Sequence, residues 1–117
     1  MLFRSPVTQR GITQGYTVVS GHVPPGDERC DIDWDRLAGS GMTLVIMMGV
    51  LHLPRITERL IEAGLDPQTP SAMVENAGLP QMRVLRSTVG EIAEIAKAEG
   101  VRPPAVTIIG EVAGLGA

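Results

Sequence analysis

The stretch Thr43-Leu44-Val45-Ile46-Met47-Met48-Gly49 decides the predicted fold of this chain of 117 residues. It is apolar on both faces of an extended chain, as a central strand of a helix-covered sheet should be. It ends at a glycine, which lets another molecule approach the backbone closely, although a buried strand that simply stops there has the same pattern. We predict a central strand over residues 42–48.

Strand and helix patterns alternate on both sides of this central strand. Four further segments have the β-prone composition of strands: residues 12–20, 70–75, 81–89 and 105–109. Three segments have the apolar spacing or the end signals of helices: residues 33–38, residues 54–63, and a segment that begins at 88 or 90 and ends at 99. Asp33 is expected to cap the first helix, and Gly64 to end the second.

The order of these segments is β-α-β-α-β-β-α-β, which predicts an α/β fold. We expect a mixed, mostly parallel sheet of about five strands, flanked by helices on both faces. The neighbouring strands 70–75 and 81–89 would form one antiparallel pair. The length fits a single domain, and the composition, 44% apolar and 20% charged, is ordinary for a soluble globular protein.

Charge and composition argue against two classes of partner. The net charge is −3 and the only aromatic residues are Phe3, Tyr16 and Trp34, whereas nucleic-acid binding normally needs a basic patch with stacking aromatics. No apolar run approaches the ~20 residues of a membrane-spanning helix. We therefore expect neither nucleic acid nor a membrane as a partner.

Cys30 is the only cysteine, which excludes an internal disulfide and fits a reducing cytoplasm. The nearby His22, Asp31 and Asp33 do not share a recognised metal-ligand spacing with it, so we expect no metal site. A Ser-His-Asp or Cys-His arrangement cannot be argued when His22 and His52 are the only histidines and no motif supports them. The residues alone therefore identify no catalytic side chain.

Four short blocks follow one another along the chain. They are Pro6-Val7-Thr8-Gln9-Arg10-Gly11, the central stretch quoted above, Pro70-Ser71-Ala72-Met73-Val74-Glu75-Asn76-Ala77 and Ile108-Ile109-Gly110-Glu111-Val112. Three of them have the pattern of a buried strand that runs into a small residue or a turn, where open α/β sheets bind ligands. The residues of these blocks and their order resemble the C-terminal half of the tetrapyrrole methylases, and in particular the enzymes that methylate uroporphyrinogen III.

This resemblance implies a larger architecture. Family members have two α/β domains with the active site between them, and their N-terminal domain carries a Gly-x-Gly-Pro-Gly-Asp segment that does not occur in this sequence. We therefore expect residues 6–117 to be the C-terminal α/β domain of a tetrapyrrole methylase, and residues 1–5 to be a truncated start or a linker. Because family members are dimers, the resemblance also implies a homodimer.

The resemblance implies a reaction as well. Family enzymes transfer methyl groups from S-adenosylmethionine to uroporphyrinogen III and leave S-adenosylhomocysteine; two transfers give precorrin-2, the precursor of sirohaem and cobalamin. We expect the parent protein to be such a cytoplasmic methyltransferase, and the chain by itself to be inactive. Two alternatives stay open: a non-catalytic α/β dimerisation or interaction domain, and a precorrin methyltransferase that acts later in corrin synthesis.

The blocks also imply which residues touch the ligands. The contacts to S-adenosylmethionine would come from Met48, Gly49, Ala77 and Gly110. The contacts to the substrate would come from Thr8 and Arg10, with Arg10 donating charge-assisted hydrogen bonds to a propionate. Gln9 stands where the family usually has histidine, and it cannot titrate in its place. On the residues alone, a solvated surface side chain is the more common role for an arginine such as Arg10.

Overall fold

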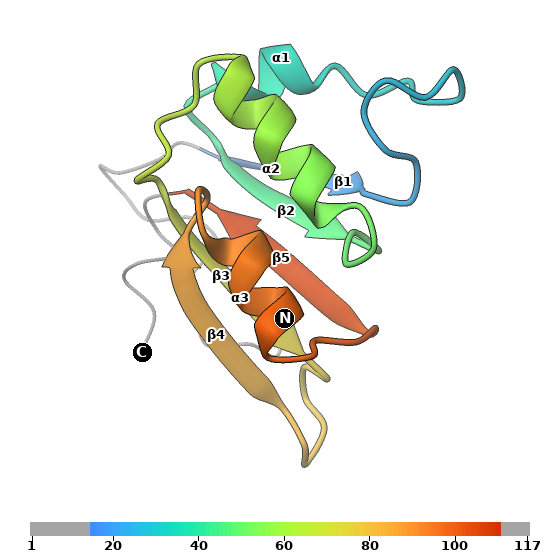
Figure 1. The fold of residues 1–117 in the computed structure, drawn as a ribbon, viewed down its shortest axis with the longest axis vertical. Helices are drawn as coiled ribbons and strands as arrows, with labels where there is room; N and C mark the ends of the chain where they lie inside the picture. The colour runs from blue at the N-terminus through green and yellow to red at the C-terminus, as the bar shows by residue number, and fades with distance from the viewer. Residues whose placement is uncertain (1–14, 111–117) are drawn as a thin grey trace.

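Five strands form one mixed sheet in the computed structural model, which describes residues 15–110 (Figure 1). The strands are β1 (Tyr16–Ser20), β2 (Thr43–Met47), β3 (Pro70–Glu75), β4 (Arg83–Thr88) and β5 (Ala105–Ile109). The helices are α1 (Trp34–Ala38), α2 (Leu53–Glu62) and α3 (Ile92–Ala98). Across the sheet the strands follow the order β1-β2-β5-β3-β4.

The predicted order of elements is confirmed, and local signals at the element ends explain why. The Asp33 side chain accepts a hydrogen bond from the backbone N–H of Arg36 at 3.0 Å and so caps α1. Gly64 follows α2 with a φ of 111°, a conformation that favours glycine. The expected antiparallel pairing of β3 with β4 is also present.

The prediction of a mostly parallel sheet is wrong. β1 and β2 pair in parallel, but β2 with β5, β5 with β3 and β3 with β4 all pair antiparallel. The cause is β5, which inserts between β2 and β3 and runs against both. The alternation of strands and helices along a chain predicts the type of each element, but it does not predict which strands become neighbours.

All three helices of the described chain cover the same face of the sheet (Figure 1), so the expectation of helices on both faces is also wrong. The chain advances across the sheet from β1 to β2 to β3, and it returns from β4 to β5, which run in the opposite direction. Connections between parallel strands are almost always right-handed. The connection from β4 to β5 crosses the sheet in the opposite direction, and its strands also run in the opposite direction. A right-handed connection of this kind lies on the same face as the connections from β1 to β2 and from β2 to β3.

Two of the three core clusters among the described residues lie between this face and the helices. Ile46 of β2 packs in one cluster with Ile56 and Leu60 of α2. Met73 of β3 packs in a second cluster with Ile92 of α3. These side chains are fully buried, and each contributes about 1.5–3 kcal/mol relative to exposure in water. The two clusters hold α2 and α3 over neighbouring parts of the sheet.

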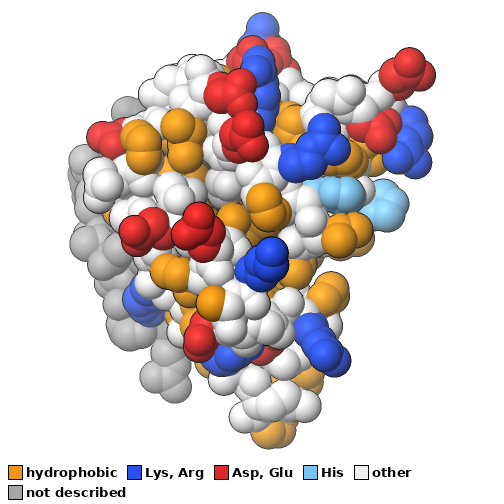
Figure 2. Space-filling view, in the orientation of Figure 1, with side chains coloured by type: hydrophobic (Ala, Val, Ile, Leu, Met, Phe, Trp, Pro, Cys, Tyr) orange, Lys and Arg blue, Asp and Glu red, His pale blue; other side chains and the backbone are white. Residues whose placement is uncertain are grey.

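The surface over the helices carries both signs of charge (Figure 2). Basic side chains lie scattered among acidic and apolar ones on this face. The face shown therefore offers no continuous basic patch of the kind that nucleic-acid binding requires. Within residues 15–110, none of the helices has the length and apolar composition to pass through a lipid bilayer.

Two glycines bring the ends of β1 and β2 together. The backbone N–H of Gly21 donates to the carbonyl of Met47 at 2.7 Å. A Cβ atom on Gly21 would lie 2.6 Å from the Cα of Gly49 and 3.0 Å from Cδ1 of Ile56. Because one of these neighbours is backbone in a close-packed interior, it cannot move aside easily. The contact fixes where the chain leaves β2.

We predict that Gly21→Ala destabilises the fold, because the added methyl group overlaps the backbone of Gly49. Overpacking of this kind costs about 1–3 kcal/mol of the free energy of unfolding. Gly39→Ala is the matched control, since a Cβ atom on Gly39 meets nothing within 4 Å. Urea unfolding measures both variants, and a Gly21→Ala midpoint equal to that of the wild type would contradict the described packing.

Candidate functional site

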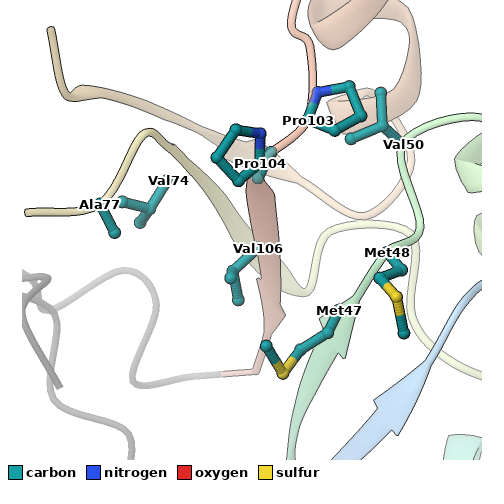
Figure 3. Close-up of a pocket in the computed structure, with 9 residues that line it drawn as sticks. Met47, Met48, Val50, Val74, Ala77, Pro103, Pro104 and Val106 are labelled. Atoms are coloured by element: carbon teal, nitrogen blue, oxygen red, sulfur yellow. The ribbon is translucent and has the colours of Figure 1, made fainter. Parts of the chain in front are cut away.

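An apolar cavity opens at the edge of the sheet where β2 and β3 end and β5 begins (Figure 3). Its volume is about 460 Å³. The lining residues come from these strands and the adjoining loops: Met47, Met48, Val50, Val74, Ala77, Pro103, Pro104, Ala105 and Val106. None of these side chains is charged, so the cavity suits an apolar group better than an ion.

Three lining residues form a row across the sheet. Val106 of β5 pairs with Met47 of β2 on one side and with Val74 of β3 on the other. Residues that pair directly point to the same face of a sheet, and Figure 3 shows the three side chains in sequence across the strands. The row exists because β5 lies between β2 and β3.

The chain turns sharply after both β2 and β3. Met48 has a φ of 55° and Asn76 a φ of 56°, and within residues 15–110 no other non-glycine residue has a positive φ. This conformation costs a non-glycine residue roughly 1–2 kcal/mol, and such residues concentrate at functional sites. The turns leave Met48 65% exposed and place both Met48 and Ala77 in the cavity lining.

Met48 and Ala77, two of the four predicted cofactor contacts, therefore lie in one cavity and approach it from opposite sides (Figure 3). Gly49 follows Met48 and is buried, but it does not line the cavity. A Cβ atom on Gly49 would lie 2.8 Å from Cγ2 of Ile46. Packing against the core thus explains the glycine at this position without a ligand.

The structure does not bring Gly110 to these residues. The N–H of Gly110 donates to the carbonyl of Pro70 at 2.9 Å, and a Cβ atom on Gly110 would lie 3.1 Å from Oγ1 of Thr43. Pro70 and Thr43 begin β3 and β2, and strands of this length span roughly 17 Å. Because β5 is antiparallel to both strands, its end meets their beginnings, beside a separate cavity of about 160 Å³.

The predicted substrate contacts Thr8 and Arg10 lie outside the described residues, as does Gln9 between them. Sequence reasoning missed the lining that β5 and its preceding loop provide. Pro103 and Pro104 have the pattern of a rigid link, and Val106 that of an ordinary strand residue. Only the position of β5 between β2 and β3 makes them part of a site, and no local pattern encodes that position.

A carboxylate lies directly after the lining residue Val74. The Glu75 side chain is 12% exposed, and it accepts hydrogen bonds from the backbone N–H of Arg102 at 2.7 Å and from Nε of Arg83 at 3.1 Å. The N–H of Arg102, and to a smaller extent the guanidinium of Arg83, lower the pKa of Glu75 below its ordinary value of 4.5. Glu75 is therefore an anion at neutral pH.

The lining of this cavity is suited to binding and orienting a ligand. The cavity lining contains no titratable side chain. In the part of the chain that the structure describes, no three His, Cys, Asp or Glu side chains come together as a metal site would need.

The fold and the cavity define an α/β domain with a ligand-sized apolar site at the carboxyl ends of two strands that run in the same direction. A family model of the tetrapyrrole (corrin/porphyrin) methylases matches residues 4–93, which is more than half of the chain. The chain belongs to this family.

Individual relatives agree with this assignment. The uroporphyrinogen-III C-methyltransferase of Pseudomonas fluorescens is 40% identical over 111 residues, which are 95% of this chain and 44% of the relative. The siroheme synthase of Tolumonas auensis is 43% identical over 110 residues, which are 94% of this chain and 23% of the relative. The crystal structure of uroporphyrin-III C-methyl transferase from Thermus thermophilus, complexed with S-adenosylhomocysteine, is 36% identical, with a TM-score of 0.75 over 94% of this chain and 46% of that one. The chain spans less than half the length of each.

We predict that Asn76→Val destabilises the chain by roughly 1–2 kcal/mol, because a β-branched residue fits a left-handed turn poorly. Asn76→Gly is the matched control, since glycine adopts this conformation freely and should unfold close to the wild type. Thermal unfolding followed by circular dichroism compares the two. If the valine and glycine variants unfold at the same temperature, the turn after β3 is not as described.

Proposed function

We propose that the cavity between the ends of β2 and β3 binds the adenosyl end of S-adenosylmethionine, with Met48 and Ala77 as contacts. The observation that carries this proposal is that these two residues, separated in the sequence, line the same apolar cavity. The solved relative from Thermus thermophilus, which is 36% identical, is a complex with S-adenosylhomocysteine. Gly49 would support the turn from behind, and Gly110 would act only from the other edge of the sheet.

The residues present fit such a ligand. Adenine is flat and uncharged, and the cavity is lined by aliphatic, proline and methionine side chains. Its volume of about 460 Å³ lies within the usual range for small-molecule sites. Thioethers such as those of Met47 and Met48 are polarisable and make favourable contacts with aromatic rings. The charged amino-acid end of the ligand would have to lie outside this cavity.

We further propose that the whole protein is a uroporphyrinogen-III C-methyltransferase, and that this chain supplies its C-terminal domain. S-adenosylmethionine would supply an electrophilic methyl group for a pyrrole carbon of the substrate. The described residues would hold the adenosyl end in one orientation, which lowers the entropic cost of reaction. Thr8 and Arg10 would contact the tetrapyrrole, and the product of two transfers would be precorrin-2, the precursor of sirohaem and cobalamin.

A homodimer is part of this proposal. Tyr16 and Val18 of the edge strand β1 are each 50% exposed, and they point to the same face because they alternate along the strand. Exposed apolar side chains that lie together favour association with another protein surface.

The free thiol of Cys30, in a chain without a second cysteine, supports a reducing cytoplasmic location.

We predict that the chain binds S-adenosylhomocysteine in the millimolar range or more tightly, as measured by calorimetry. Met48→Asp should weaken this binding at least about tenfold, because it places a charge in an apolar cavity. Leu51→Asp is the matched control, since Leu51 is 83% exposed and does not line the cavity. Equal affinities of the wild type and Met48→Asp would contradict the proposed site.

We also predict that the 117-residue chain alone forms no precorrin-2 from uroporphyrinogen III and S-adenosylmethionine. In a chimera, this chain would replace the matching segment of the Pseudomonas fluorescens relative and follow the first half of that protein. The chimera should restore methyl transfer, because the two halves would share the cleft. The same chimera with Met48→Asp controls for background activity. Methyl transfer by the isolated chain would contradict the proposal that the chain needs the other half of the protein for activity. A folded but inactive chimera would contradict the assigned substrate.

A further inference from the structure

Glu75 occupies an unusual place behind the cavity. It is the last residue of β3, directly after Val74, yet it is not itself a lining residue. Neighbouring strand residues point to opposite faces, so its carboxylate lies on the other side of the sheet from the Val74 side chain. Its side chain is only 12% exposed. A nearly buried carboxylate needs hydrogen-bond donors, and here they come from other segments of the chain.

One donor comes from the loop that forms the far side of the cavity. Oε2 of Glu75 accepts the backbone N–H of Arg102 at 2.7 Å, and residues 103 and 104 follow as cavity lining. Proline has no backbone N–H. Arg102 therefore carries the only backbone N–H between Val101, which bonds to α3, and Ala105, which begins β5. Glu75 thus accepts the only backbone N–H that residues 102–104 can donate.

The same loop is held at its other end by the residue after Glu75. The N–H of Asn76 donates to the carbonyl of Pro104 at 2.9 Å. The two hydrogen bonds connect the end of β3 to residues 102–104 on both sides of the prolines. The position of the proline wall, defined as Pro103 and Pro104, relative to Val74 and Ala77 thus depends on these two contacts.

Arg83 fixes the carboxylate in turn. Its Nε donates to Oε1 of Glu75 at 3.1 Å, and its Nη2 donates to the carbonyl of Glu99 at 2.8 Å. The Glu99 carboxylate lies 3.9 Å from Nη1 of Arg83. Glu75 is therefore oriented from β4 and from the end of α3 while it holds the loop.

We propose that Glu75 is a positioning residue that holds the proline wall of the cavity through the N–H of Arg102 and thereby sets the affinity for the adenosyl group. This inference rests on the proposed function of the cavity. Glu75 touches no ligand in this account, and it acts only through the position of residues 102–104.

The proposal has a pH signature with a definite sign. The pKa of Glu75 is lowered in the folded chain, so the bond to Arg102 is complete above the ordinary value of 4.5 and is lost as the pH falls through the lowered pKa. The charged groups that face the carboxylate are Arg83 and Arg102, with Glu99 beyond Arg83. Wild-type affinity should therefore be flat near neutral pH and decline only in acid.

The test measures S-adenosylhomocysteine affinity by calorimetry in the wild type, Glu75→Ala, Glu75→Gln and Glu99→Gln. Glu75→Ala should weaken binding about tenfold, since it removes a charge-assisted acceptor. Glu75→Gln keeps one acceptor oxygen, so it should recover part of the affinity and lose the acid-dependent decline. Glu99→Gln is the matched control, because it removes a carboxylate beside Arg83 and leaves the bond to Arg102; it should bind like the wild type.

Hydrogen exchange of the Arg102 amide provides a readout that does not need the ligand. The amide should be protected in the wild type and in Glu99→Gln, and exposed in Glu75→Ala. If the wild type does not bind S-adenosylhomocysteine, the proposed function fails, and exchange alone then decides whether Glu75 holds the loop. Wild-type affinity in a folded Glu75→Ala variant, or equal Arg102 protection in both proteins, would overturn the proposal.

Discussion

The antiparallel ladder of β5 between β2 and β3 is the constraint on which the rest of the structure depends. Because β5 lies between them, β2 and β3 are two inter-strand spacings apart, about 9.6 Å, although they run in the same direction. The start of β5 fills that interval, and the row Met47–Val106–Val74 becomes the floor of a cavity. Had β2 and β3 been direct neighbours, Val106 and the two prolines would not lie there.

The loops around this floor are held by backbone geometry and by a few hydrogen bonds. The close approach of Gly21 to Gly49 fixes the exit from β2, and left-handed turns at Met48 and Asn76 direct the chain around the opening. On the far side, Glu75 and Asn76 bond to the loop that carries the prolines. A site that is prepared in this way loses less entropy when a ligand binds.

Sequence reasoning succeeded where the signal was local. Asp33, Gly64 and the apolar run of β2 identify their elements because caps and hydrophobic periodicity act over a few residues. The family resemblance assigned Met48, Ala77 and Gly110 to one site. Met48 and Ala77 do line one cavity, because both follow strands that run in the same direction, whereas Gly110 lies away from it because β5 runs the other way. The contact of Glu75 with Arg102 spans 27 residues and has no sequence signature.

The central claim is that the cavity between β2, β3 and β5, rather than the one beside Gly110, receives the adenosyl group. NMR of the methionine methyl groups during a titration with S-adenosylhomocysteine tests this directly, because an aromatic ring shifts the signals of the methyl groups that it contacts. Met47 and Met48 line the first cavity and Met42 the second. The account predicts that the signals of Met47 and Met48 shift while that of Met42 does not. Shifts at Met42 with Met47 and Met48 unchanged would contradict it.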